Sequence, residues 1–301
     1  MKKVIMKGKD WLAFIGLSLA WGTSFLWIKI AVEEISPFSL VVLRILFGII
    51  GLLVVIAVRK PKWPKQNKQW LALAVIGVIN VAVPFMLITW GEQYIDSGLA
   101  SVLNGSVPLF SVILAHFYLT DDRLNWMKMI GVLVGFSGVV VLVYKDIQSG
   151  IQNNLLGQGA VLLAAIFYAI SSVYIRKNTK GIDTIVQAIL PLMAADLFLV
   201  ISAPLIGGNF EMPTLPMTWV AVLWLGLVGS CVAYLLYYYL IHSVGPSRAT
   251  MVTFTFPVIG VILGVSFLGE PLHWNLALGC FLVIASIMIV NRKPTKRTSM
   301  E

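Results

Sequence analysis

Long apolar runs separated by short polar segments recur along the whole chain. Each run holds about 20 residues, the length that an α-helix needs to cross a hydrocarbon core of about 30 Å. The runs are continuous and do not alternate with polar residues, which favours membrane helices over the strands of a membrane barrel. We therefore predict an all-α integral membrane protein with ten transmembrane helices, whose bounds are 11–31, 38–58, 70–90, 99–119, 127–144, 157–175, 184–204, 217–241, 247–268 and 275–290.

The composition agrees with a chain that is solvated mainly by lipid. Of the 301 residues, 59% are hydrophobic and 12% are charged, whereas soluble domains carry about 25% charged residues. These proportions exclude an ordinary soluble enzyme, a disordered protein and a nucleic-acid-binding protein. The two cysteines and three histidines form no metal-ligand spacing, and the sequence contains no GxxxxGK[ST] loop for ATP. We expect no metal and no cofactor.

Basic and acidic residues fall on alternate connections between the predicted helices. One set of connections, which includes both termini, holds nearly all of the lysines and arginines. The other set holds Lys145 as its basic residue together with acids that include Glu33, Glu34, Asp96, Glu211 and Glu270. By the positive-inside rule, both termini are cytoplasmic and the protein is a multi-pass protein of the cell membrane. The same distribution explains the net charge of +9 without a nucleic-acid partner. The expected partners are the lipid bilayer and a small-molecule substrate, for a monomer or a homodimer.

The second half of the chain repeats the first. Residues 97–141 align without gaps to residues 246–290, and the repeat unit contains five predicted helices. Because five is odd, the second copy must cross the membrane with the opposite orientation. We predict one transmembrane domain made of two inverted five-helix repeats, residues 1–150 and residues 151–301. This architecture is typical of carriers that work by alternating access.

Two residue pairs in this alignment are informative, because apolar matches are common among membrane helices. One pairs the acids Asp121 and Glu270, and the other pairs Pro108 with Pro257. Proline removes a backbone hydrogen bond and bends a helix. We therefore predict that Pro108 and Pro257 act as hinges.

Three motifs are similar to those of EamA-type members of the drug/metabolite transporter superfamily. They are Ala-Trp-Gly-Thr-Ser-Phe at residues 20–25, Pro37 followed by Arg44, and residues 249–257 leading into Gly-Glu-Pro at 269–271. The resemblance covers essentially the whole chain, although Thr-Asp-Asp at 120–122 departs from the Gly-Glu pair that the family often shows. It implies ten helices, of which the fifth and tenth are peripheral. It also implies a cavity lined mainly by helices one, three, four, six, eight and nine.

Charged side chains inside the predicted helices are few, and such residues are functional candidates. Lys29 lies near the outer end of the first helix, where it reaches the interface or pairs with Glu33. Arg44 lies about two turns inside the second helix and needs an acid, carbonyl groups or an anionic substrate. Asp196, in the seventh helix, lies at a similar depth. It is either the buried partner of Arg44 or a carboxylate that couples transport to protons.

Polar and aromatic residues otherwise cluster in the helices that the resemblance assigns to the cavity. Few fixed charges among many aromatic rings suit neutral, zwitterionic or amphipathic solutes. Many Ser and Thr hydroxyls are expected to bond the backbone of their own helix instead. We expect Trp90, Asn104, Tyr168 and Tyr234 to share one central pocket. The candidate substrate-binding residues are Trp21, Thr23, Asn80, Trp90, Asn104, Ser106, Tyr168, Ser171, Tyr234, Tyr238 and Thr253.

These features favour a secondary carrier of small organic solutes. We expect an exporter of amino acids or related metabolites that works by alternating access. An importer or exchanger of nucleotide-like or phosphorylated metabolites and a drug efflux carrier stay open as alternatives. A membrane-embedded enzyme would need a nucleophile–base pair or a metal cluster at membrane depth, and the sequence shows neither. The repeat and the lack of a filter-like motif argue against a channel.

Overall fold

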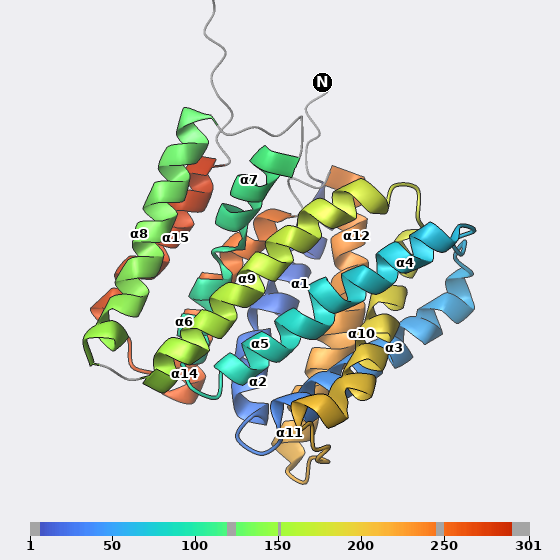
Figure 1. The fold of residues 1–301 in the computed structure, drawn as a ribbon, viewed down its shortest axis with the longest axis horizontal. Helices are drawn as coiled ribbons and strands as arrows, with labels where there is room; N and C mark the ends of the chain where they lie inside the picture. The colour runs from blue at the N-terminus through green and yellow to red at the C-terminus, as the bar shows by residue number, and fades with distance from the viewer. Residues whose placement is uncertain (1–6, 119–124, 150–151, 245–249, 291–301) are drawn as a thin grey trace, which may run out of the picture.

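The fold is a bundle of α-helices (Figure 1). The computed structural model describes residues 7–118, 125–149, 152–244 and 250–290, and these residues contain no strand. Asp121, which the sequence alignment pairs with Glu270, lies outside the described residues. Five helices run without interruption: α3 (Pro37–Arg59), α8 (Trp126–Ser149), α9 (Gln152–Asn178), α10 (Thr184–Ile206) and α15 (Trp274–Val290).

The other helices follow one another as shorter pieces in five composite runs. The segments named η1 and η2 are π-helical, and η3 is a 3₁₀-helix. The pieces are α1 (Gly8–Gly22) with α2 (Ser24–Ala31); α4 (Asn67–Ile76) with η1 (Gly77–Ala82) and α5 (Val83–Gly91); α6 (Ser97–Asn104) with α7 (Val107–Tyr118); α11 (Pro216–Leu223) with η2 (Trp224–Val232) and α12 (Ala233–Val244); and η3 (Thr250–Thr255) with α14 (Phe256–Leu268).

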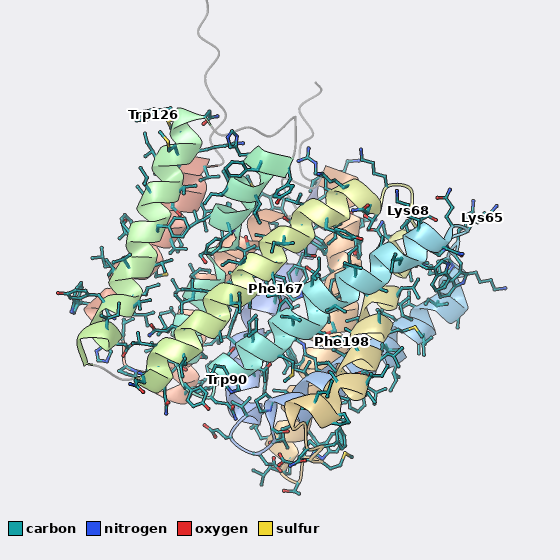
Figure 2. The ribbon with its side chains drawn as sticks, in the orientation of Figure 1. Lys65, Lys68, Trp90, Trp126, Phe167 and Phe198 are labelled. Carbon is teal, nitrogen blue, oxygen red and sulfur yellow. The ribbon has the colours of Figure 1, made fainter. Side chains whose placement is uncertain are left out.

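Nine helical runs among the described residues are long and apolar enough to cross a membrane. The tenth predicted span, 275–290, corresponds to α15, which is apolar but has only 17 residues. Large apolar side chains such as Leu133, Phe198 and Phe267 are exposed on the surface of the bundle (Phe198 is labelled in Figure 2). An apolar outer surface of this kind suits contact with lipid, so the structure is that of an all-helical membrane protein.

Helices α8 and α15 form a closely packed pair at one edge of the bundle (Figure 1). Glycine permits this approach: a Cβ on Gly131 would lie 2.9 Å from the carbonyl oxygen of Ser286. Likewise, a Cβ on Gly138 would lie 3.1 Å from the carbonyl oxygen of Gly279. Such close backbone contact is typical of small residues at membrane helix interfaces. The edge position agrees with the peripheral places that the resemblance implies for the fifth and tenth helices.

A carboxylate fastens the start of α6 at what we name the Glu92 end of the bundle. At this end lie the α2–α3, α5–α6, α10–α11 and α14–α15 connections. Glu270 accepts hydrogen bonds from the N–H groups of Ser97 (2.7 Å) and Gly98 (2.9 Å). These N–H groups open a helix and have no acceptor within it, and the positive end of the helix dipole favours an anion there. Glu270 thus links the α14–α15 connection to α6.

A second carboxylate at the Glu92 end fastens the segment before α11. Glu34 accepts hydrogen bonds from the Thr214 hydroxyl (2.8 Å) and from the N–H groups of Thr214 and Leu215. Together with the nearby Thr218 hydroxyl, these donors lower the pKa of Glu34 to about 2. The α2–α3 connection is therefore tied to α11 by a carboxylate that stays ionised in mild acid.

At the opposite end, which we name the Asp10 end, a buried acid joins α1 to α12. Asp10 is 3% exposed and accepts hydrogen bonds from the Tyr239 hydroxyl (3.1 Å) and the Ser243 hydroxyl. Its carboxylate also accepts from the N–H of Lys7 (2.7 Å), which precedes α1. The same carboxylate thus caps the first helix and holds it against the eighth helical run.

The third and eighth helical runs share two local features. Each contains a π-helical segment, η1 or η2. Each also has a tryptophan that bonds back to a proline carbonyl six residues earlier. Trp70 Nε1 donates to the Pro64 oxygen at 3.1 Å, and Trp219 Nε1 donates to the Pro213 oxygen at 3.0 Å. The two runs therefore begin with the same kind of entry turn.

Replacing Glu270 by Ala should lower the free energy of unfolding by roughly 1–3 kcal/mol, because two buried N–H groups of α6 would lose their acceptor. Glu270→Gln keeps one carbonyl oxygen and should cost less. Unfolding of the purified protein in mixed micelles measures both. Glu33→Ala is the matched control, since Glu33 is an exposed acid at the same end. Equal stability of Glu270→Ala and the parent would contradict this account of the cap.

The Glu34 contacts predict how the stability of the protein depends on pH. A carboxylate whose pKa is lowered in the folded state stabilises that state above its ordinary pKa of 4.5, and the effect is lost as the pH falls from there toward about 2. Glu34→Gln should therefore melt below the parent at neutral pH, and the two melting temperatures should converge toward pH 2. A gap that stays constant over this range would show that the ionised carboxylate is not the stabilising group.

Candidate functional site

A buried arginine lies at the centre of the candidate site. Arg44 on α3 is 5% exposed, and its Nε donates to the Ser230 hydroxyl oxygen across 3.4 Å. Its guanidinium carbon lies 3.9 Å from the centroid of the Phe85 ring, a cation–π contact. The Ser230 hydroxyl itself donates to the carbonyl oxygen of Leu225. Within the described ranges no carboxylate bonds to the guanidinium, and Glu92 acts on it without forming a bond. The direct contacts of the cation are thus a ring and a weak neutral acceptor.

The expected ion pair between Arg44 and Asp196 is not formed. One carboxylate oxygen of Asp196 is buried without a hydrogen-bond partner in the described part of the chain, and no bond joins it to Arg44. Similar depth in two helices fixes the height of two side chains but not the direction in which each one points. Arg44 faces Phe85 and Ser230, whereas Asp196 is half-buried on α10 without a bond to either. A coupling role for Asp196 stays a prediction.

Beside Arg44 lies an aromatic cluster, which we define as Trp21, Tyr234, Tyr237, Tyr238 and Phe256. The Trp21 ring centroid lies 5.3 Å from that of Tyr237 and 5.9 Å from that of Tyr234. Phe256 meets the same indole edge to face at 6.1 Å, and Tyr238 stacks on Tyr234 at 6.3 Å. Trp21 Nε1 donates to the Gly229 carbonyl oxygen at 3.0 Å. Trp21 thereby ties α1 to η2, α12 and α14.

Tyr168 of α9 connects Arg44 with the aromatic cluster. Its ring packs against both large apolar clusters of the core, and Trp21 packs against one of them and Tyr234 against the other. Gly229, whose carbonyl oxygen accepts from Trp21, lies beside the cation, since a Cβ there would lie 3.7 Å from Arg44 Nη2. The cation and the rings are therefore parts of one site, built by α1, α3, α5, α9, η2, α12 and α14.

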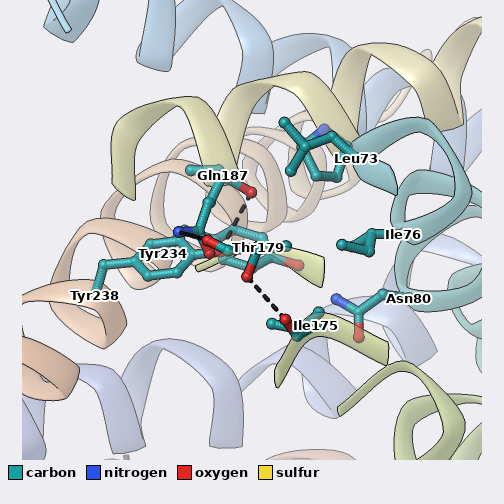
Figure 3. A pocket seen from close by; sticks show the side chains of 10 residues that line it. Leu73, Ile76, Asn80, Ile175, Thr179, Gln187, Tyr234 and Tyr238 are labelled. Carbon is teal, nitrogen blue, oxygen red and sulfur yellow. Dashed lines mark hydrogen bonds between the residues drawn. The ribbon is translucent and has the colours of Figure 1, made fainter. Parts of the chain in front are cut away.

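A narrow crevice with room for about one water molecule lies beside Tyr234 and Tyr238 (Figure 3). Asn80 of η1 lines it from the other side. The Tyr238 hydroxyl donates to the Gln187 carbonyl oxygen at 3.2 Å, and the Thr179 hydroxyl is bonded within α9. The polar groups of this wall are thus largely satisfied by the backbone, and the crevice is a side chamber of the aromatic cluster.

Several sequence-predicted residues meet in this region. Four of them lie in the aromatic cluster or the side chamber, namely Trp21, Asn80, Tyr234 and Tyr238. Tyr168 and the charged Arg44 lie beside them.

Other predicted residues have different surroundings. The hydroxyls of Thr23 and Ser106 bond the carbonyls of Leu19 and Leu103, and Thr23 also accepts from Trp224 Nε1 at 3.0 Å. One polar atom in each of two further side chains, Asn104 Oδ1 and Ser171 Oγ, is buried without a partner in the ranges that the structure describes. Thr253 lies half-buried in η3.

Trp90 and Lys29 lie at the Glu92 end and not in the central region. Trp90 is in the last turn of α5, where its ring meets that of Tyr94 at 4.9 Å (Trp90 is labelled in Figure 2), so the structure does not bring it into the expected central pocket. Lys29 does not pair with Glu33. Its ammonium donates instead to the carbonyl oxygens of Glu92 (2.7 Å) and Ile95 (2.9 Å), because the α5–α6 connection passes directly over it.

Pro108 and Pro257 stand where helix geometry changes. α7 begins at Val107, just after the break that follows α6, and α14 begins at Phe256, directly after η3. The two regions also touch, since a Cβ on Gly105 would lie 2.8 Å from Cγ of Pro257. Their hinge role stays a prediction.

Sequence reasoning missed two residues of the region. Phe85 reads as one more apolar residue of a long run, and no sequence signal marks it as the ring beneath Arg44. Glu92 did carry a signal, because it is an acid at the end of an apolar run, between Gly91 and Gln93.

Comparisons with known proteins give a consistent result. The model of a family described as "EamA-like transporter family" matches residues 10–144 and 155–292. The chain is 31% identical to the "Uncharacterized inner membrane transporter YedA" of Escherichia coli, over 92% of this chain and 89% of the relative. It is 27% identical to the "Uncharacterized transporter YoaV" of Bacillus subtilis, over 93% and 96% of the two chains. A solved crystal structure with 20% sequence identity covers 95% of this chain at a TM-score of 0.64, which shows a shared fold.

Proposed function

Because this chain belongs to the EamA-like transporter family, we propose that it is a secondary carrier that moves small organic solutes across the cell membrane by alternating access. We further propose that it exports amino acids or related metabolites. The observation that carries the choice of solute is the buried Arg44, to which no carboxylate of the described residues is bonded, beside an aromatic cluster.

Arg44 supports a solute with a carboxylate. A buried guanidinium that is not bonded to an acid is unfavourable alone and gains from an incoming anion, which it binds with two parallel N–H bonds. Ser230 and Phe85 hold the guanidinium in place without neutralising it. The rings of Trp21 and Tyr234 provide apolar and cation–π contacts for the remainder of the solute. A zwitterion with an apolar side chain fits these groups.

The alternatives fit the site less well. A nucleotide-like or phosphorylated solute carries two or more negative charges, and the described part of the central region offers one cation, Arg44. A cationic drug would be repelled by the same positive charge, because no carboxylate among the described residues is bonded to Arg44. Both alternatives remain outcomes of the transport test below.

Two features support an inverted repeat. The residues of the Trp70–Pro64 bond each stand 149 positions before those of the Trp219–Pro213 bond, the same offset that aligns residues 97–141 with residues 246–290. The π-helical segments η1 and η2 overlap at that offset as well. We propose that the two copies, residues 1–150 and 151–301, exchange roles when the carrier changes its open side.

The charge distribution supports an orientation with the Asp10 end in the cytoplasm. Lys65 and Lys68 lie at that end (Figure 2), and the positive-inside rule places such residues inside. The Glu92 end then faces outward. There Glu270 and Glu34 fasten neighbouring segments together, so we interpret the structure as a state that is closed toward the outside.

The orientation is tested with single cysteines in a chain whose Cys231 and Cys280 are replaced by Ser. In intact cells, a membrane-impermeant maleimide should label Asn209→Cys, because the α10–α11 connection faces outward. It should label Lys65→Cys only after the cells are permeabilised. Labelling of Lys65→Cys in intact cells would invert the topology.

The solute class is tested by counterflow into proteoliposomes with a panel of radiolabelled compounds. Amino acids with apolar or aromatic side chains should exchange, whereas the matching amines without a carboxylate should not. Arg44→Gln should reduce exchange by roughly ten- to a hundredfold, since a hydrogen bond to a charged group contributes about 1.5–3 kcal/mol.

Arg59→Gln is the matched control for Arg44→Gln, because Arg59 is an exposed arginine at the end of the same helix. It should exchange solute like the parent. Equal exchange of amino acids and amines would contradict the carboxylate site, and exchange of phosphorylated compounds alone would favour the first alternative.

A further inference from the structure

Glu92 is a carboxyl group enclosed within the closed end of the bundle. It directly follows α5, and its side chain has no exposed surface. Neither carboxyl oxygen has a hydrogen-bond partner in the described part of the chain. An ionised carboxylate in such a place is strongly unfavourable, because nothing replaces the water that it loses. A protonated carboxyl is neutral and far less costly to bury.

The nearest cation does not neutralise Glu92. The Lys29 ammonium donates to the backbone oxygens of Glu92 (2.7 Å) and Ile95 (2.9 Å), and it forms no ion pair with the carboxyl group of Glu92. Lys29 thus binds the backbone of the α5–α6 connection and not the Glu92 side chain. It remains within reach as an ionic partner if that connection moves.

The charged groups that act on Glu92 come from three neighbouring elements. They are Lys29 on α2, Arg44 on α3 and Glu270 on the α14–α15 connection. Burial has the largest influence and raises the pKa of Glu92 well above that of an exposed glutamate. Lys29 and Arg44 act in the opposite direction, and Glu270 adds to the effect of burial.

We propose that Glu92 binds one proton when the Glu92 end is closed, and that release of this proton to the outer solution accompanies opening of that end. If the proposed function is correct, this proton couples transport to the proton gradient, and that part of the inference rests on the proposed function. The proton site itself does not depend on a transported solute. On release, the proton leaves a carboxyl oxygen for water, and the carboxylate left behind gains hydration and the Lys29 ammonium as a partner.

The geometry links Glu92 to the closure itself. Five residues separate it from Gly98, and the segment between them is held by Lys29 on one side and by Glu270 on the other. α6 then packs tightly on α14: a Cβ on Gly98 would lie 3.3 Å from the Cα of Val261. In the proposal, water reaches the buried Glu92 when this contact loosens. A proton bound to Glu92 therefore favours the closed state, and its loss favours the open one.

The coupling is tested with a cysteine at Ser101, a fully buried residue of α6 that contacts Gly260 of α14. In Ser101→Cys with Cys231 and Cys280 replaced by Ser, the rate of maleimide labelling is divided by that of the exposed Asn209→Cys at each pH. The ratio should rise with pH by up to about tenfold per pH unit, the limit for release of one proton. It should stay low and flat in Glu92→Gln, while the exposed-acid control Glu33→Gln should follow the parent.

A labelling ratio that does not change with pH in the parent would overturn the proposal without any Glu92 variant. A labelling ratio that rises with pH in Glu92→Gln as it does in the parent would overturn it as well. A second measurement is infrared spectroscopy of the purified protein at neutral pH. The parent should show the C=O stretch of a protonated carboxyl group that Glu92→Gln lacks, and identical spectra would also overturn the proposal. Neither measurement needs a solute, so failure of the counterflow panel would count against the proposed function and leave the proton site standing.

Discussion

Every backbone N–H and C=O group inside a bilayer must find its partner within the protein, and the architecture of this bundle depends on that constraint. Interruptions of helices are therefore tolerated where the protein supplies substitutes. At Thr23, between α1 and α2, the backbone groups stay paired: the Thr23 N–H donates to the Leu19 oxygen, and the Thr23 oxygen accepts from the Trp27 N–H. At the start of α6, the carboxylate of Glu270 accepts from the first N–H groups. Both sites lie in the bundle and not on its lipid-facing surface.

Hydrophobic pattern alone predicted most of the helices, because lipid imposes a length of about 20 apolar residues on each span. It did not predict the changes of helix type. η1 and η2 lie inside uniformly apolar runs, where a π-helical turn has the same composition as an α-helical one. The position of Arg44 along its helix was predictable, but its partner was not. The sequence gives the depth of Asp196, whereas the rotation and packing of α10 decide where that side chain points.

The central region and the Glu92 end each bury an ionisable group that is not bonded to an opposite charge, and the two groups have opposite signs. Arg44 stays charged, since a guanidinium does not lose its proton in proteins, and a ring and a hydroxyl accompany it. The carboxyl group of Glu92 has no hydrogen-bond partner among the described residues, and a bound proton would remove its charge. A buried cation and a buried acid that are not bonded to an opposite charge are both unfavourable. Each gains when something enters, in one case an anion and in the other a proton or water.

The direction in which the tyrosines of the aromatic cluster point depends on how many residues precede them in their helix, and the π-helical segment η2 is part of that count. It precedes Tyr234, Tyr237 and Tyr238, and a π turn contains more residues than an α turn. Because the extra residue is taken up by the wider turns, deleting one residue from Trp224–Val232 with a return to α geometry would leave the later residues pointing in much the same direction. A deletion in α11, which is already α-helical, would instead rotate everything after it by about 100° relative to the start of the helix. All three tyrosines would then turn away from Trp21. Single-residue deletions in this helical run should therefore be tolerated within η2 and not within α11.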